Sequence, residues 1–94
     1  MSKGMKYAEV REIVYKRYHG KCAICGNAIA LEEMTIDHIV PASKGGGKDF
    51  ANMQCTCYSC NCMKHFLTQE EFYKKLLRVT LHNLRNIFKV YAKI

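Results

Sequence analysis

The chain has 94 residues, six of them cysteines, and a formal net charge of +7. A chain this short forms one domain with a small core, so we expect a metal ion or disulfides to stabilise it. Its longest apolar run falls far short of the roughly 18 residues of a membrane span, which favours a soluble protein.

The first predicted element is a helix over about 6–19, followed by Gly20 where a left-handed C-cap would stand. Four apolar residues recur along it at helical spacing and predict one buried face: Tyr7, Val10, Val14 and Tyr18. No secretory signal precedes this helix, so we expect a cytoplasmic protein whose thiols stay reduced.

Residues 34–40 (MTIDHIV) form a β-prone run that ends at Pro41. The polar, glycine-rich segment that follows predicts a loop over about 41–50. A short strand at 52–54 and a helix over about 58–66 come next. The pattern therefore places two short strands before a helix.

Thr68 and Glu71 form a capping box, which predicts a last helix over about 69–93. Apolar residues fill about half of its circumference, which is wider than the stripe that one core contact needs. The excess indicates a second partner, either the N-terminal helix folded back or another copy of the chain, so both a monomer and a homodimer stay open.

The positive charge is concentrated at the two ends of the chain. Residues 1–21 and residues 69–94 each carry six Lys or Arg against two Glu, whereas the middle has three bases and four acids. Two basic flanks around a nearly neutral centre favour a nucleic-acid partner, although solvated helix faces would give the same pattern.

Two pairs of cysteines have the CxxC spacing of a tetrahedral zinc site: Cys22 with Cys25, and Cys57 with Cys60. Four thiolates leave no open position, so we expect a structural Zn²⁺. Disulfides are the alternative, which the lack of a secretory signal disfavours. Cys55 and Cys62 leave a second alternative, since either could replace a ligand of the second pair.

A second cluster of polar residues suggests reaction chemistry. Asp37 is a hard oxygen ligand of the kind that Mg²⁺ or Mn²⁺ prefers, and His38 can take a proton near neutral pH. Neighbours on a strand point apart, so both reach one substrate only where the strand ends or bends, as Pro41 suggests. Asn61 and His65 are four apart on a predicted helix and would project from one face.

The order of these motifs resembles that of the HNH endonuclease family. From Gly20 to Lys64, a CxxC is followed by DHIVP, paired glycines, an asparagine and a second CxxC that continues into CNxxK. The resemblance implies an α+β fold with a ββα-metal (His-Me finger) core at about 20–66: a hairpin with a long loop, packed on a helix. It also implies a single nuclease domain over residues 1–94.

The resemblance assigns roles position by position. His38 matches the general base that activates water, and Asp37 matches a ligand of the catalytic Mg²⁺ or Mn²⁺. Asn52 matches the asparagine that holds the loop and orients the base. Asn61 stands where other members have histidine, which makes the chain an H-N-N variant, and is expected to ligate the metal. His65 matches a metal histidine only in some branches.

The implied function is a metal-dependent DNA endonuclease that nicks one strand as a monomer, or cuts both as a dimer. We expect basic side chains to contact phosphates with little sequence reading: Arg17, Lys21, Lys44, Lys48 and Lys64. The alternatives are a zinc-stabilised basic DNA-binding module without nuclease activity, or a zinc-stapled domain that docks partners on its last helix.

Overall fold

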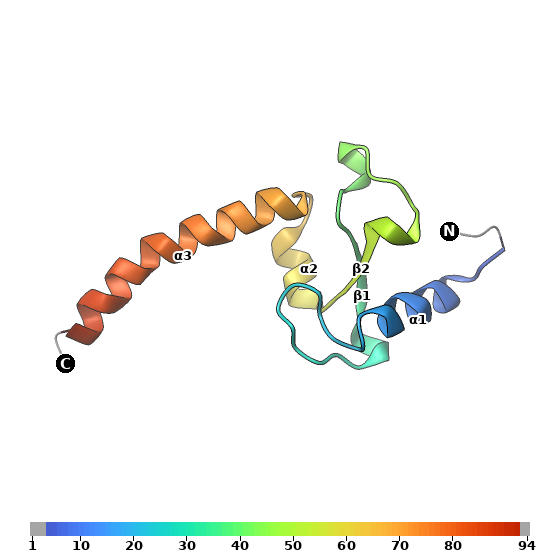
Figure 1. The fold of residues 1–94 in the computed structure, drawn as a ribbon, viewed down its shortest axis with the longest axis horizontal. Coiled ribbons are helices and arrows are strands. Elements are labelled where there is room, and N and C mark those ends of the chain that lie inside the picture. Colours follow the sequence, from blue (N-terminus) through green and yellow to red (C-terminus); the bar gives the residue numbers. More distant parts are fainter. Residues whose placement is uncertain (1–3, 93–94) are drawn as a thin grey trace.

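The computed structural model describes residues 4–92, with side chains up to residue 89 (Figure 1). Its helices and strands, in chain order, are α1 (Tyr7–Arg17), β1 (Thr35–His38), β2 (Met53–Thr56), α2 (Tyr58–Lys64) and α3 (Gln69–Ala92). The two strands pair, α1 contacts both of them, and α2 contacts β1. The predicted α+β class is confirmed, and the arrangement is that of a hairpin packed on a helix.

The hairpin is antiparallel, and its register sets Asp37 opposite Gln54 and His38 opposite Met53. Side chains alternate between the two faces along a strand, but β1 ends at His38, where the chain enters the loop. The second strand begins one residue later than predicted and runs to Thr56, because the preceding residues form a 3₁₀ turn. The expected loop contains a second such turn at Ala42–Lys44.

The first helix covers the hairpin with Val10 and Val14, both buried. It ends earlier than predicted, since the chain reverses over His19 and Gly20, which both have positive φ. The expectation that Tyr7 is buried is wrong: this residue is exposed. It occupies the first helical position, one turn before the residues that enter the core.

The start of α3 carries the predicted capping box, which is confirmed. The Glu71 backbone N–H donates to the Thr68 hydroxyl at 3.2 Å, and the Thr68 N–H donates to the Glu71 carboxylate at 3.0 Å. Lys44 also pairs with this carboxylate. Hydrogen bonds from Lys44 and then from Thr68 lower the pKa of Glu71 to about 2.

Beyond its first turn, α3 leaves the rest of the molecule (Figure 1). Phe72 is buried, but the apolar residues further along are exposed: Leu77, Val79, Leu81, Leu84, Ile87 and Phe88. The radius of gyration is 16.5 Å, against about 12 Å for a compact chain of this length. The first helix lies against the hairpin instead of folding back on α3, and residue 93, the predicted helix end, lies outside the described residues.

Among residues 4–92, we find no helix with the length and hydropathy that crossing a bilayer requires. The buried core is correspondingly small. Its main apolar cluster comes from α1, the segment between α1 and β1, β2 and α2: Val10, Val14, Cys22, Ile29, Met34, Met53, Cys55 and Cys60. Two predicted zinc ligands are thus themselves part of the core.

Candidate active site and metal centre

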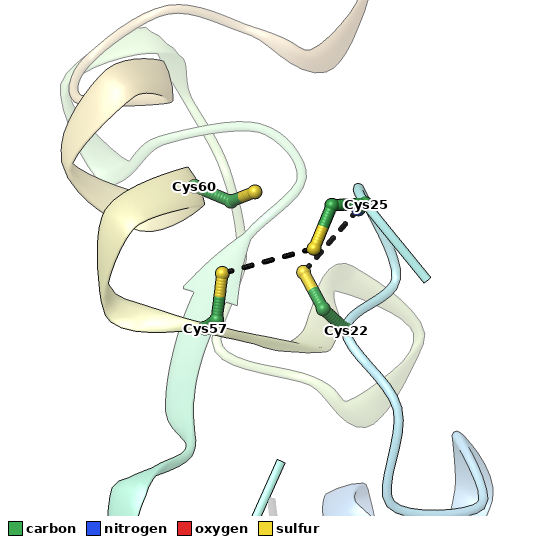
Figure 2. Close-up of side chains that lie close together, drawn as sticks. All are labelled: Cys22, Cys25, Cys57 and Cys60. Atoms are coloured by element: carbon green, nitrogen blue, oxygen red, sulfur yellow. Dashed lines mark hydrogen bonds between the residues drawn. The ribbon is translucent and has the colours of Figure 1, made fainter. Parts of the chain in front are cut away.

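Four cysteine thiols meet between the segment after α1 and the start of α2, with all sulfur atoms within 4.8 Å of one another: Cys22, Cys25, Cys57 and Cys60 (Figure 2). The Cys25 and Cys57 sulfurs are 3.9 Å apart. Sulfurs at the corners of a tetrahedron around Zn²⁺ lie about 3.8 Å apart, given a Zn–S bond of about 2.3 Å. The four residues therefore fit a closed zinc site, and the two predicted CxxC pairs lie together.

The first cysteine pair lies in a tight turn. The backbone N–H groups of Ile24 and Cys25 donate to the Cys22 sulfur at 3.4 and 3.5 Å. The turn closes with the Gly26 N–H on the Cys22 carbonyl at 2.9 Å, and Gly26 has φ +79°. The two N–H groups on the Cys22 sulfur stabilise a thiolate, as metal binding requires.

The second cysteine pair opens α2, with Cys57 as the N-cap residue and Cys60 in the first turn. The Ser59 hydroxyl and then the Cys60 backbone N–H lower the pKa of Cys57 to about 6. A thiolate at this position is therefore available near neutral pH.

The two remaining cysteines are not part of the cluster. Cys62 is exposed on α2, whereas Cys55 is 0% exposed and packs in the core. Burial raises the pKa of Cys55, which keeps it a neutral thiol. Its backbone carbonyl accepts a hydrogen bond from the Ala23 N–H at 2.8 Å, so Cys55 joins the first cysteine turn to β2 from outside the cluster.

A second site is a cavity of about 250 Å³ between β1, the loop and the end of α2. It brings together four of the residues predicted for reaction chemistry: Asp37, His38, Asn61 and His65. The rest of its wall comes from β1, the loop and the residue after His65: Ile36, Pro41, Ala42, Ser43 and Phe66. The carboxylate and amide oxygens are donors that fit Mg²⁺ or Mn²⁺, whereas imidazole is a ligand of transition metals.

Asp37 is 5% exposed and already has protein partners. Gln54 donates to its Oδ2 at 2.8 Å, and the Lys64 ammonium donates to its Oδ1 at 3.2 Å. The same ammonium donates to the His38 carbonyl at 2.8 Å, and the Gln54 amide also donates to Gln69 Oε1 at 2.6 Å. A buried polar network thus links both strands to the last residue of α2 and the first residue of α3.

The prediction that Lys64 contacts DNA phosphates is wrong, because its side chain is 0% exposed and its ammonium faces Asp37. Gln54 and Gln69 were not among the residues predicted for this site. Gln54 lies between two apolar residues of a short strand. A polar side chain at such a position could have indicated a polar partner across the hairpin.

Asn52 fastens the loop that follows His38. Its Oδ1 accepts from the Val40 N–H at 2.9 Å, while its Nδ2 donates to the carbonyls of Val40 at 3.0 Å and Gly47 at 2.8 Å. A Cβ at Gly46 would lie 1.7 Å from the Val40 carbonyl oxygen, so only glycine fits there. This geometry makes Asn52 a positioning residue, since its amide is fully engaged with the loop backbone.

The far wall of the cavity differs from the expectation. The helix ends at Lys64, and His65 has φ +49°, so Asn61 and His65 do not share a helical face as predicted. The chain turns there with the His65 N–H on the Asn61 carbonyl at 3.0 Å, and the His65 ring lies 3.9 Å from that of Phe66. Both predicted donors nevertheless line the same cavity.

The remaining basic residues predicted to meet DNA are at the surface. Lys21 and Lys48 are exposed. Arg17 is exposed too, but its guanidinium donates to the Phe50 carbonyl at 2.6 Å and lies over the Phe50 ring, 5.7 Å from its centroid. Lys44 pairs with the carboxylate of the α3 capping box.

Residues 22–67 match the family model described as HNH endonuclease. A comparison with curated proteins found no match. The matched segment begins at the first clustered cysteine and ends just after the cavity-lining residues 65 and 66, so it contains both sites. The match supports a nuclease-type module that binds nucleic acid and metal. The segment 22–67 therefore belongs to the HNH endonuclease family.

Proposed function

We propose that this protein is a metal-dependent DNA endonuclease, acting as one HNH nuclease domain over residues 1–94. The observation that carries the proposal is the cavity in which His38 lies with three side chains able to hold a hard cation: Asp37, Asn61 and His65. The match of residues 22–67 to the family model supports the same reaction class.

In this proposal His38 is the general base that takes a proton from the attacking water, a role that imidazole performs well near neutral pH. Asn52 binds the loop backbone that follows His38, and Lys64 donates to the His38 carbonyl. These contacts fix the end of the strand that carries the imidazole. A Mg²⁺ or Mn²⁺ ion held by Asp37, Asn61 and His65 would stabilise the charge on the transition state and the leaving 3′-oxygen.

Binding to DNA comes from exposed basic side chains that neutralise phosphates, with Lys21, Lys48 and Arg17 next to the nuclease core. Such contacts give an affinity that falls steeply with salt and little sequence specificity. With one base and one catalytic ion, a monomer nicks a single strand, whereas a homodimer would hold two centres. The zinc site, with four sulfur donors and no open position, serves stability.

The test is incubation of supercoiled plasmid with the zinc-loaded protein and Mg²⁺ or Mn²⁺. The wild type should yield nicked circles, and His38→Ala should slow nicking by roughly 10²- to 10⁴-fold, the usual contribution of a general base. His82→Ala, an exposed histidine on α3, is the matched control and should cut like the wild type. Absence of cutting with every divalent metal, or equal cutting by His38→Ala, contradicts the proposal.

A second candidate function is a DNA-binding module without nuclease activity. The ion pair between Asp37 and Lys64 favours it, since the carboxylate that would hold a cation already has a partner. DNA binding by fluorescence anisotropy together with an uncut plasmid in the assay above would select this alternative.

A further inference from the structure

The buried ammonium of Lys64 is a fixed charge in the floor of the candidate active site. Its side chain is 0% exposed, and its Nζ lies 3.2 Å from Asp37 Oδ1, 3.1 Å from Asp37 Oδ2 and 2.8 Å from the His38 carbonyl oxygen. A charge is kept inside a protein when it is paired and hydrogen-bonded, as here. Lys64 is thus held against Asp37 as one half of a buried ion pair.

The formal charge at the cavity is set by one ion pair. Asp37, the single carboxylate in the lining, contributes −1, and the Lys64 ammonium, buried behind it and bonded to it, contributes +1. The sum is zero. Hard divalent cations are held mainly by carboxylates, and here the single carboxylate among the candidate donors is neutralised at hydrogen-bonding distance. Such a site attracts a divalent cation weakly by itself.

Few acceptor positions of Asp37 remain for a cation. A carboxylate offers about four acceptor positions. Gln54 and Lys64 contact Oδ2, and Lys64 also contacts Oδ1. Gln54 is held in turn by Gln69 at 2.6 Å, so it is not free to swing away. One position, on Oδ1, remains for a further contact. Asp37 is thus limited to a single-oxygen contact with a cation.

We propose that Lys64 makes cation binding at this site depend on DNA, because a phosphodiester supplies the negative charge that the neutral cavity lacks. This inference rests on the proposed function. The divalent ion and the DNA then bind as a coupled pair, and each raises the affinity of the other by the same factor. Lys64 is a positioning residue that sets this dependence, in addition to holding the backbone of His38.

The test measures Mn²⁺ binding from the free-ion signal in electron paramagnetic resonance, using the full, zinc-loaded chain with His38→Ala so that DNA stays intact. Mn²⁺ is titrated into the protein, a short DNA duplex, and their mixture. We expect the mixture to bind Mn²⁺ more tightly than its two components, by about tenfold or more. Anisotropy of the labelled duplex should show the same factor when Mn²⁺ is added at constant ionic strength.

Variants at residue 64 identify the cause. Lys64→Met, added to the same background, removes the charge with a similar shape, so the protein without DNA should bind Mn²⁺ about tenfold or more tightly and the effect of DNA should shrink. Lys64→Arg keeps the charge and should keep the coupling. Lys74→Met removes an exposed lysine from α3 and should leave the coupling unchanged.

Equal Mn²⁺ affinity with and without DNA overturns the inference, and this measurement needs no residue-64 variant to fold. A folded Lys64→Met protein whose Mn²⁺ affinity is unchanged also overturns it. Plasmid nicking by the wild type separates the two proposals. If the protein nicks plasmid but DNA does not change its Mn²⁺ affinity, only the proposed role of Lys64 is rejected. If DNA raises the Mn²⁺ affinity but the plasmid stays intact, the endonuclease is rejected and the coupled binding is retained. If the protein neither nicks plasmid nor binds Mn²⁺, both proposals are rejected.

Discussion

The two candidate metal sites are both built around the seven-residue helix α2 and differ in their donor atoms. At the start of the helix, Cys57 and Cys60 join two distant cysteines in a cluster of four soft sulfur donors. Further along the helix, Asn61 lines a cavity together with His65, the residue after its last turn. Thiolates suit Zn²⁺, whereas the carboxylate and amide oxygens of the cavity suit Mg²⁺ or Mn²⁺.

The comparison teaches that the dependence between the sites runs in one direction. The cysteine cluster fixes the start of α2 against the segment after α1, so the far end of this short helix, and with it the cavity, is placed by the cluster. The cavity adds little packing, because most of its lining is polar or exposed. Loss of the cysteine site should therefore remove both sites, while damage to the cavity should leave the cysteine site intact.

The largest effect should follow loss of zinc. Cys60→Ser, or removal of the metal by a chelator, should abolish cooperative thermal unfolding, because zinc binding contributes roughly 10 kcal/mol or more to folding in structural sites. The measurement is a thermal melt followed by circular dichroism, with zinc content determined in parallel. Cys62→Ser, at an exposed cysteine outside the cluster, is the matched control. A cooperative transition in the metal-free protein would break the comparison.

An intermediate effect should follow Gly46→Ala in the loop beside the cavity. The new Cβ would lie 1.7 Å from the Val40 carbonyl oxygen, so the loop must shift, at a cost of about 1–3 kcal/mol typical of overpacking. We expect nicking to fall by about tenfold or more, since small misplacements of a site are costly, while zinc content stays the same.

Gly47→Ala is the matched control for the loop. Its Cβ would meet only the Asp49 carboxylate, at 2.9 Å, and that side chain can move. We expect near wild-type nicking and stability. Loss of zinc from Gly46→Ala, or equal nicking by both variants, would contradict the one-way dependence.

The smallest effect should come from Glu71, which lies in neither site. Its pKa of about 2 in the folded protein is below its ordinary value of 4.5. Its contribution to stability is therefore complete above pH 4.5 and is lost as the pH falls towards about 2. Glu71→Gln should lower the melting temperature slightly, by an amount that stays constant from pH 8 to pH 6, where the thiolates keep their zinc.

Glu70→Gln provides the comparison for this carboxylate, because Glu70 pairs only with the exposed Lys74 in the next turn. It should change the melting temperature less. A difference between the wild type and Glu71→Gln that shrinks across pH 8 to 6 would show that another group titrates with the cap.

The parts of the fold that the sequence predicted correctly are those with local signals. The CxxC spacing identified the four clustered cysteines, since each pair makes its own turn before the pairs meet. The capping box at Thr68 and Glu71 needs only residues three apart. The HNH motifs pointed to Asp37 and His38, and these residues do share a cavity, although their roles there stay predictions.

What the sequence missed depends on distant partners or on backbone turns without a glycine. Lysines are rarely buried, so nothing local revealed that Lys64 pairs with Asp37 in another element. His65 adopts a positive φ that sequence seldom predicts for a residue other than glycine. Tyr7 fits the helical pattern of a buried face, yet the core ends one turn short of it.

The projection of α3 has a consequence for how this protein can change over time. Its residues beyond Leu77 lie far from the cysteine cluster and the cavity, and substitutions at sites more than about 10 Å apart act independently. The distal half of the helix is therefore free to acquire a new binding specificity without a penalty in folding or in reaction chemistry. An HNH core with such an arm is suited to evolve new partners while its centre stays the same.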